Sequence, residues 1–229
     1  PPEFEPQIGM VEQVLAALRI HAVSKPNYEA DDVIATLTTQ ATREGWQVLV
    51  ASGDRDTFQL VTDDVTVLYP VRGVSQVVRM TPEEVNTKYG VPPANYPDLA
   101  ALVGETSDNL PGVPGVGPKT AAKWLNQYGS LDVLLAEADA VKGKVGENLR
   151  NNLEQVRLNR QINQLVTDLD LPVTLADLAL TEFDRDEVNQ VLTDLQFGNG
   201  SGRPIRNLLR PSRLTPAHPL SLGQMSGTS

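Results

Sequence analysis

The sequence contains no cysteine and only two histidines, His21 and His218. Without cysteine the chain has no disulfide framework and no thiolate-bound zinc site, and two histidines leave carboxylates as the only plentiful metal ligands. Any metal bound to this chain should therefore be a hard ion such as Mg²⁺ or Mn²⁺.

Long hydrophobic runs are also missing. No apolar stretch approaches the roughly 18 residues that span a bilayer, and no basic-then-apolar leader opens the chain. With 40% hydrophobic and 21% charged residues, we expect a soluble, cytoplasmic, globular protein. There is no initiator Met before Pro1, so we expect a piece of a longer protein that is truncated at its N-terminus.

Acidic residues are absent from residues 198–229, which hold four arginines among Gly, Ser and Pro without apolar periodicity. We expect this segment to be a disordered, non-native tail, produced by a frameshift, a gene-model error or vector sequence. Removing its four positive charges from the net charge of −10 leaves about −14 for residues 1–197. Net charge taken alone argues against nucleic-acid binding.

The apolar spacing predicts an α/β layer followed by a helical region, with the border near Gly104. Residues 7–20 and 30–43 should be helices, and residues 20–23 and 48–51 strands of a parallel unit. Residues 65–69 and 75–80 should pair as a hairpin, and the capping box at residues 81–84 should start a helix that Gly90 ends. Further helices are predicted at 98–103, 119–128, 131–136, 145–165 and 185–195.

Two acidic clusters follow this pattern of strands and helices. Glu29, Asp31 and Asp32 stand where a helix begins, and Asp54 and Asp56 come just after the next strand. Because the carboxyl ends of parallel strands share one edge of a sheet, these side chains could converge, and crowded carboxylates call for a cation such as Mg²⁺ or Mn²⁺. The alternative is that the acids complement a helix dipole and make a turn.

A third acidic stretch, with Glu105 and Asp108, runs directly into a Gly- and Pro-rich segment at residues 110–120. There Gly115, Val116 and Gly117 should form a hairpin that opens a helix, with Lys119 and Thr120 in the first turn. Bare N–H groups and the positive end of a helix dipole suit a phosphate oxygen without reading base sequence. The segment is neither a nucleotide P-loop nor a dinucleotide fingerprint, because no strand precedes it. The alternative is a linker between helices.

Basic residues cluster in the predicted helical half, whereas acidic residues cluster in the α/β half. The negative net charge of the chain therefore does not exclude DNA binding by the helical half. The alternative is that each one lies on a solvated helix face. The residues concerned are Lys123, Lys142, Lys144, Arg150, Arg157 and Arg160.

Four motifs in order, Glu-Ala-Asp-Asp, Gly-Asp-Arg-Asp, Ser-Asp-Asn-Leu-Pro-Gly and Gly-Val-Gly-Pro-Lys-Thr, resemble the 5′ nuclease domain of bacterial DNA polymerase I, most closely its actinobacterial branch. The resemblance covers residues 1–197. It implies a PIN-like α/β nuclease core at 1–103, here incomplete, followed at 104–197 by a helix-hairpin-helix (helix-three-turn-helix) region that binds DNA. The implied activity is that of a 5′–3′ exonuclease and flap endonuclease, acting as a monomer on double-stranded or branched DNA with a 5′ flap.

The same resemblance implies two divalent ions, Mg²⁺ or Mn²⁺, and no protein nucleophile. Glu29, Asp31 and Asp32 match the first metal group, and Asp54, Asp56, Glu105 and Asp108 match the second. The family usually has Asp where Glu105 stands. Gly115, Val116, Gly117, Lys119 and Thr120 match the DNA-gripping hairpin, which often holds a K⁺ ion on its carbonyls, and Lys123 is a candidate for DNA contact beside it. Lys142 and Lys144 are further DNA-contact candidates.

The family's first strand with its leading Asp, a second Asp further on and a basic arch have no counterpart in the sequence, so we expect weak metal binding and slow or absent cleavage. The main rival interpretation is therefore a catalytically impaired module that binds branched DNA and leaves it intact, which salt-sensitive binding without cleavage would reveal. A second rival is a carboxylate-cage ribonuclease of the toxin type, whose fold does not need the hairpin at residues 111–117.

Overall fold

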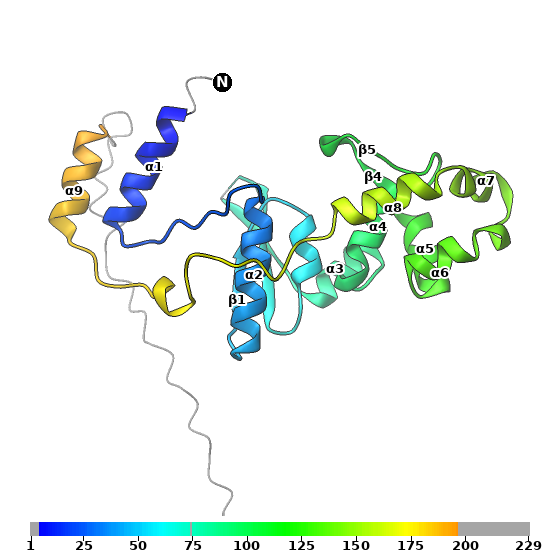
Figure 1. The fold of residues 1–229 in the computed structure, drawn as a ribbon, viewed down its shortest axis with the longest axis horizontal. Coiled ribbons are helices and arrows are strands. Elements are labelled where there is room, and N and C mark those ends of the chain that lie inside the picture. Colours follow the sequence, from blue (N-terminus) through cyan, green and yellow to red (C-terminus); the bar gives the residue numbers. More distant parts are fainter. Residues whose placement is uncertain (1–4, 74, 197–229) are drawn as a thin grey trace, which may run out of the picture. The chain divides into compact units, whose positions relative to one another are not determined.

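The computed structural model describes residues 5–73 and 75–196 (Figure 1). The chain divides into two compact units, one of Val23–Ala179 and one that joins Pro1–Ala22 to Leu180–Ser229. The tail predicted at residues 198–229 lies outside the described residues. In the part that is described, no helix is long and apolar enough to cross a membrane.

The smaller unit pairs helix α1 (Glu5–Ala17) with helix α9 (Arg185–Asp194). Ala17 is buried against Val188 and Leu192, and Arg19 forms a 2.8 Å ion pair with Glu187. The two predicted helices are confirmed. The strand predicted at residues 20–23 is wrong, because a left-handed turn at Arg19 (φ 58°) ends the helix and an irregular segment follows.

The sheet has three described strands in the order β1 (Val48–Ala51), β2 (Val65–Arg72) and β3 (Gln76–Met80). β1 pairs parallel with β2, and β2 pairs antiparallel with β3, so the predicted hairpin is confirmed. Helix α2 (Ala30–Arg43) precedes β1, and a 3₁₀ turn, η1 (Asp56–Leu60), leads from β1 toward β2. Phe58 of η1 is fully buried against the sheet.

Helix α3 (Pro82–Tyr89) begins and ends where the sequence predicts. Thr81 caps its start by accepting a 3.3 Å hydrogen bond from the backbone N–H of Glu84, and Gly90 ends it in the left-handed conformation at φ 74°. After a 3₁₀ turn, η2 (Pro93–Asn95), comes helix α4 (Tyr96–Val103).

Helix α4 joins the two halves of the larger unit. Tyr96 and Ala100 belong to the core beneath the sheet, whereas Leu99 and Leu102 belong to the core of the helical region. The chain therefore has no break at Gly104, and the predicted border there separates two parts of one compact unit.

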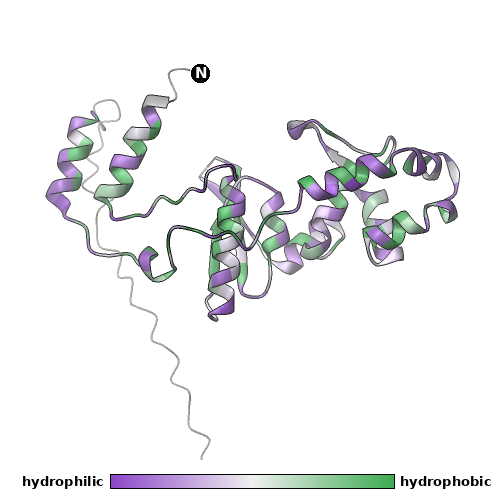
Figure 2. Cartoon of the chain, in the orientation of Figure 1, coloured by the Kyte–Doolittle hydropathy of each residue, from purple (hydrophilic) through white to green (hydrophobic). Residues whose placement is uncertain are grey.

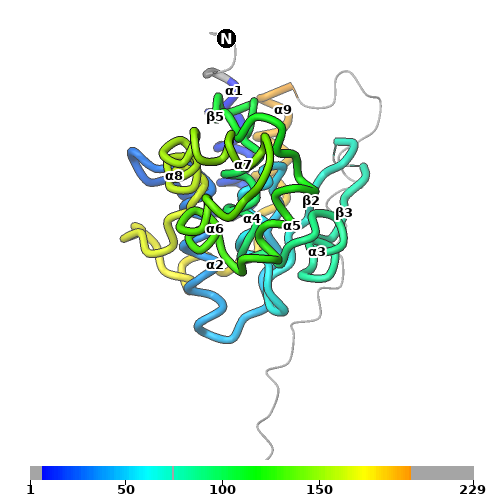
Figure 3. Tube along the Cα trace, turned by 90° about the vertical axis from the view of Figure 1, so that its right-hand side faces the viewer, coloured from blue at the N-terminus to red at the C-terminus, as the bar shows by residue number. Residues whose placement is uncertain are grey.

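The helical region contains α5 (Pro118–Tyr128), α6 (Leu131–Ala136), η4 (Ala138–Ala140), α7 (Gly143–Asn151) and α8 (Leu153–Ile162). Figure 3 shows α4 among these helices, in contact with α5 and α8. The single helix predicted at 145–165 is wrong: Asn152, at φ −124° and ψ 18°, leaves helical geometry and separates α7 from α8.

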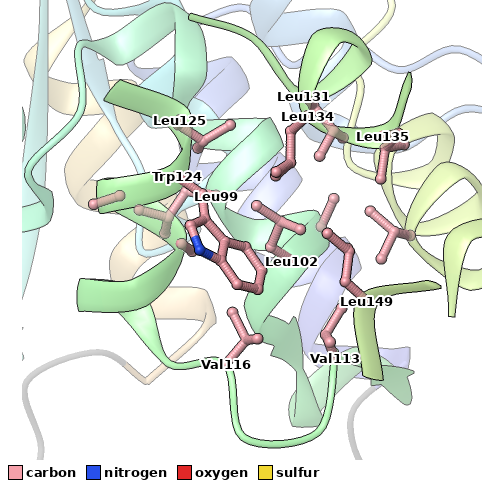
Figure 4. Close-up of a cluster of buried hydrophobic side chains, with 14 of the residues drawn as sticks. Leu99, Leu102, Val113, Val116, Trp124, Leu125, Leu131, Leu134, Leu135 and Leu149 are labelled. Carbon is pink, nitrogen blue, oxygen red and sulfur yellow. The ribbon is translucent and has the colours of Figure 1, made fainter. Parts of the chain in front are cut away.

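Apolar faces hold this region together, as the green and purple sides of its helices show (Figure 2). Trp124 of α5 lies at the centre of the cluster, with Leu99, Leu102, Val116 and Leu134 around it (Figure 4). A fully buried aliphatic side chain contributes about 1.5–3 kcal/mol to folding, so this cluster is a main source of stability for the helical region.

Candidate metal centre and nucleic-acid interface

The turn after β1 places two acids at the carboxyl end of that strand. The backbone N–H of Asp54 donates to Ser52 Oγ at 3.0 Å, and the N–H of Asp56 donates to Asp54 Oδ1 at 2.8 Å. Such side-chain-to-backbone bonds two residues apart stabilise tight turns. Asp56 Oδ1 is buried and has no hydrogen-bond partner in the described part of the chain.

The first turn of α2 holds the second acidic cluster. Glu29 is its N-cap, and Asp31 and Asp32 follow in the first turn, where acids are stabilised by the helix dipole. Asp32 accepts hydrogen bonds on both oxygens, from the N–H of Glu29 at 3.3 Å and from that of Val166 at 2.9 Å. Its carboxylate therefore ties the start of α2 to the chain beyond α8.

The third acidic stretch is a hairpin in which β4 (Gly104–Glu105) pairs with β5 (Leu110–Pro111), with η3 (Thr106–Asp108) between them. The two strands cross so closely that a Cβ on Gly112 would lie 1.9 Å from the carbonyl oxygen of Val103. Gly104, at φ 79°, would meet Gly112 N at 2.2 Å. Only glycine fits this crossing, which fixes the positions of Glu105 and Asp108.

These three segments line one pocket of about 520 Å³. Six of the seven acids predicted as metal ligands line it, and the seventh, Glu105, lines an adjoining pocket of about 340 Å³ together with Arg55. The structure thus brings the predicted acids into one region, although they come from widely separated parts of the sequence. The six are Glu29, Asp31, Asp32, Asp54, Asp56 and Asp108.

The acids are close enough to perturb one another. Burial and then the charges of Glu105 and Asp54 raise the pKa of Asp56 from 3.8 to about 7. Burial and then Asp54 raise the pKa of Asp31, and burial and then Asp108 raise the pKa of Glu105, which Arg55 partly offsets. A cation among these groups would relieve the repulsion.

The donor set fits a hard divalent ion. The pocket offers carboxylate oxygens, the ligand type that Mg²⁺ prefers, and Asp56 supplies a buried oxygen that accepts no other bond. Across the described residues, no three His, Cys, Asp or Glu side chains already stand in the close arrangement of a finished cage.

The pocket has a wall that sequence reasoning missed. The segment after α8 closes it through Asn163, Gln164 and Leu165. Gln59 holds this segment, because its Nε2 donates to the Asn163 carbonyl at 2.8 Å and its Oε1 accepts from the N–H of Leu165 at 3.2 Å. No motif marks these residues, since only the packing of α8 against α4 carries them to the acids.

The hairpin before α5 has the predicted form. Gly115 adopts φ 80°, Gly117 is the N-cap of α5, and Val113 and Val116 are buried below. Within the described chain, the N–H groups of Gly115, Gly117 and Lys119 donate no hydrogen bond, whereas that of Thr120 is bonded to the Gly117 carbonyl. These N–H groups belong to exposed or half-buried residues, and Lys119 and Lys123 are exposed on the following helix.

Helix α7 supports this hairpin and adds charge beside it. Asn148 Nδ2 donates to the Pro114 carbonyl at 2.7 Å, and a Cβ on Gly115 would touch Val145 at 3.6 Å. Lys142 occupies the N-cap position of α7 without a side-chain capping bond, and Lys144 lies in the first turn, next to Val145, which faces Gly115 of the hairpin. Among the described residues Lys144 pairs only with Glu147, in an exposed 3.0 Å ion pair, and such a weak surface pair leaves it available to a phosphate.

The three arginines of the predicted basic cluster make internal contacts. Arg160 donates to Asp98 at 2.6 Å, and Arg150 donates to the Ala138 and Val141 carbonyls. Arg157 lies 4.0 Å from Glu154 on the same helix. For Arg150 and Arg160, a structural role explains their positions, so the lysines are the better candidates for DNA contact.

Comparison with known proteins agrees with this architecture. Residues 1–90 match the 5′–3′ exonuclease N-terminal resolvase-like domain, and residues 91–186 match the 5′–3′ exonuclease C-terminal SAM fold. DNA polymerase I of Mycobacterium bovis is 56% identical over 197 residues, which are 86% of this chain and 22% of that protein. The thermostable DNA polymerase I of Thermus thermophilus is 42% identical over 200 residues, 87% of this chain and 23% of that protein.

Among solved structures, the bacteriophage T5 D15 flap endonuclease in a pseudo-enzyme–product complex with DNA and metal ions superposes with a TM-score of 0.55 at 21% identity. The match covers 73% of this chain and 58% of that one, and it confirms the predicted fold class. This chain spans less than a quarter of the length of the curated relatives named above. With both family domains matched in order over residues 1–186, the chain belongs to the 5′–3′ exonuclease family.

Proposed function

We propose that this chain hydrolyses DNA phosphodiester bonds as a structure-specific 5′–3′ exonuclease and flap endonuclease, in primer removal and repair. The observation that carries the proposal is the single pocket lined by six acids from three segments. A nearby hairpin with free N–H groups supplies a site for the DNA backbone. The family membership and the T5 structure, which holds DNA and metal ions, support it.

The proposed cofactor is a pair of Mg²⁺ or Mn²⁺ ions. Glu29, Asp31 and Asp32 would serve one ion, and the second would use Asp54, Asp56, Glu105 and Asp108. Bound divalent ions activate water and stabilise the departing oxygen, so no protein nucleophile is needed. Of the first group, Asp31 has the freest carboxylate, since both oxygens of Asp32 already accept backbone hydrogen bonds.

The proposed partner is double-stranded or branched DNA with a 5′ flap, bound by a monomer in the cytoplasm. The duplex would lie on Gly115, Val116, Gly117, Lys119, Thr120 and Lys123, with Lys142 and Lys144 beside them. A K⁺ ion at the hairpin is a further proposal. Its ligands would be the Gly115 and Val116 carbonyls, which accept no hydrogen bond within the described residues, unlike those of Val113, Pro114 and Gly117.

A cleavage assay on a 5′-labelled flap duplex tests the proposal. The full chain should release the flap in Mg²⁺ and not in EDTA, and Asp54→Asn should reduce the rate by at least a hundredfold. Arg79→Ala on β3 is the matched control, because it removes a charge outside the acidic pocket. Cleavage that persists in EDTA, or in the Asp54→Asn variant, would refute metal-dependent hydrolysis at this pocket.

The second candidate is a module that binds branched DNA and leaves it intact. The hairpin favours this candidate, because its free N–H groups can contact a phosphate without a metal ion. Gel-shift assays would then show salt-sensitive binding at protein concentrations where no cleavage occurs in Mg²⁺ or Mn²⁺. Cleavage that saturates at the same protein concentration as binding would exclude this candidate.

A further inference from the structure

Asn163 is a buried polar residue without an evident structural role. It is the C-cap of α8, its exposed fraction is 1%, and its Nδ2 has no hydrogen-bond partner in the described part of the chain. Buried side-chain amides are normally hydrogen-bonded, because an unsatisfied donor costs its full desolvation penalty. The unpaired Asn163 Nδ2 therefore suggests that a bound ligand or water molecule accepts its hydrogen bond.

Asp56 provides the complementary atom. Its Oδ1 is the other buried side-chain atom without a partner among the described residues, so the two orphans are one donor and one acceptor. Both residues line the same acidic pocket. They are also tied together: Gln59 Nε2 donates to the Asp56 carbonyl at 2.9 Å and to the Asn163 carbonyl at 2.8 Å.

One donor and one acceptor are partners that a single water molecule can take together. Buried waters bind where two to four polar partners meet, and two residues that line one pocket and share the Gln59 amide supply two such partners. Because Asn163 and Asp56 both line the acidic pocket, a water held between them would be near the proposed metal ligands Asp31, Asp54 and Asp108. Mg²⁺ and similar ions usually keep several waters in protein sites.

We infer that Asn163 is a positioning residue of the metal site, whose side-chain amide holds a water of the ion's hydration shell against Asp56. This inference rests on the proposed function, since it assumes that the pocket binds a divalent ion. Asn163 does not bind the ion itself; it fixes one of the ion's waters. Outer-shell partners of this kind typically change metal affinity 10- to 100-fold when they are mutated.

The experiment measures Mn²⁺ affinity, by the loss of the free-ion EPR signal, and the melting temperature of the metal-free full chain. The variant is Asn163→Leu, which replaces the orphan amide with an apolar side chain of similar shape. The matched control for stability is Asn159→Leu, because the Asn159 amide is equally buried but donates to the Ala101 and Pro111 carbonyls.

We expect Asn163→Leu to weaken Mn²⁺ binding at least tenfold and to leave the metal-free melting temperature unchanged or higher. Asn159→Leu should lower that temperature by several degrees. Equal Mn²⁺ affinity in wild type and Asn163→Leu would overturn the inference and leave the metal site standing. A drop in metal-free melting temperature for Asn163→Leu as large as for Asn159→Leu would also overturn it, because the water would then be purely structural. Absence of Mn²⁺ binding by the wild type would overturn the proposed metal site together with the inference.

Discussion

The backbone N–H of Val166 donates a 2.9 Å hydrogen bond to Asp32 Oδ1, which fixes the chain after α8 to the first turn of α2. The neighbouring acid, Asp31, accepts no hydrogen bond within the described residues, and burial raises its pKa together with the charge of Asp54. Two consecutive aspartates therefore differ in role. Asp32 stabilises the wall of the pocket, whereas the Asp31 carboxylate is free for a cation.

This difference predicts opposite effects on the metal-free protein. Asp32→Ala removes both acceptors and should lower the free energy of unfolding by about 1–3 kcal/mol. Asp31→Ala removes a repelled charge and should leave that free energy unchanged or higher. Urea denaturation at pH 7.5 in EDTA measures both, and equal destabilisation by the two variants would contradict the assignment.

The raised pKa of Asp56 predicts how stability depends on pH. The carboxyl holds its proton in the folded state up to a pKa of about 7, whereas in the unfolded chain it loses it near 3.8. Between these values the folded state binds more protons, so metal-free stability should fall as pH rises from about 4 to 7. In the same range Mg²⁺ affinity should rise, because the ion competes with the proton.

Asp56→Asn is the control for this pH dependence. An amide does not titrate, so the variant should be more stable than wild type at pH 7.5 in EDTA by about 1–2 kcal/mol, once solvent screening is allowed for. Its melting temperature should also change less between pH 5 and 7.5. A wild-type protein that becomes more stable over this range would show that Asp56 is not the controlling group.

The backbones of the β4–β5 hairpin approach so closely that one added methyl group should destabilise the folded protein strongly. Gly112→Ala places a Cβ 1.9 Å from the Val103 carbonyl oxygen, so the backbone must move and displace Glu105 and Asp108. We expect a loss of roughly 3 kcal/mol or more in the free energy of unfolding. Gly53→Ala is the control, because its Cβ would make an ordinary 3.7 Å contact with Pro70. Similar melting temperatures for the two variants would contradict the described crossing.

The exposed lysines beside the hairpin predict the affinity of the chain for duplex DNA and its dependence on salt. The double variant Lys119→Ala and Lys123→Ala should bind duplex DNA about tenfold more weakly, with no change in sequence preference. The slope of log affinity against log salt should fall by about 2, because two phosphate contacts are lost. Fluorescence anisotropy between 50 and 200 mM salt measures both quantities, and an unchanged slope would place the DNA elsewhere.

Much of the fold follows from local sequence signals. The bounds of α2, β1 and α6 are predicted to the residue, because apolar spacing and the glycine or proline breaks next to them agree. The strand expected at residues 20–23 fails, since a short apolar run does not form a strand unless another strand pairs with it. The helix expected at 145–165 fails at Asn152, where apolar periodicity continues through a change of direction.

In the candidate site, too, local sequence signals predict some residues and miss those that tertiary packing brings in. The strand expected at residues 20–23 does not form, so of the acids only Asp54 and Asp56 could be predicted to lie at a strand end. Asn163 and Gln59 could not be predicted as part of the site, because a single amide in a helix has no signature in sequence and becomes visible only when its burial and missing partner are known. The distinct role of Asp32 likewise depends on a contact with Val166, 134 residues away.

The most direct measurement of the central claim is the anomalous diffraction of crystals of the full chain soaked in Mn²⁺. The account predicts anomalous peaks inside the pocket, within coordination distance of carboxylate oxygens from Asp54 and Asp56 and of at least one of Asp31, Asp108 and Glu105. The peaks should vanish in crystals of Asp56→Asn. Crystals that bind Mn²⁺ only outside this pocket, or not at all at millimolar concentration, would contradict the claim that these acids form a metal centre.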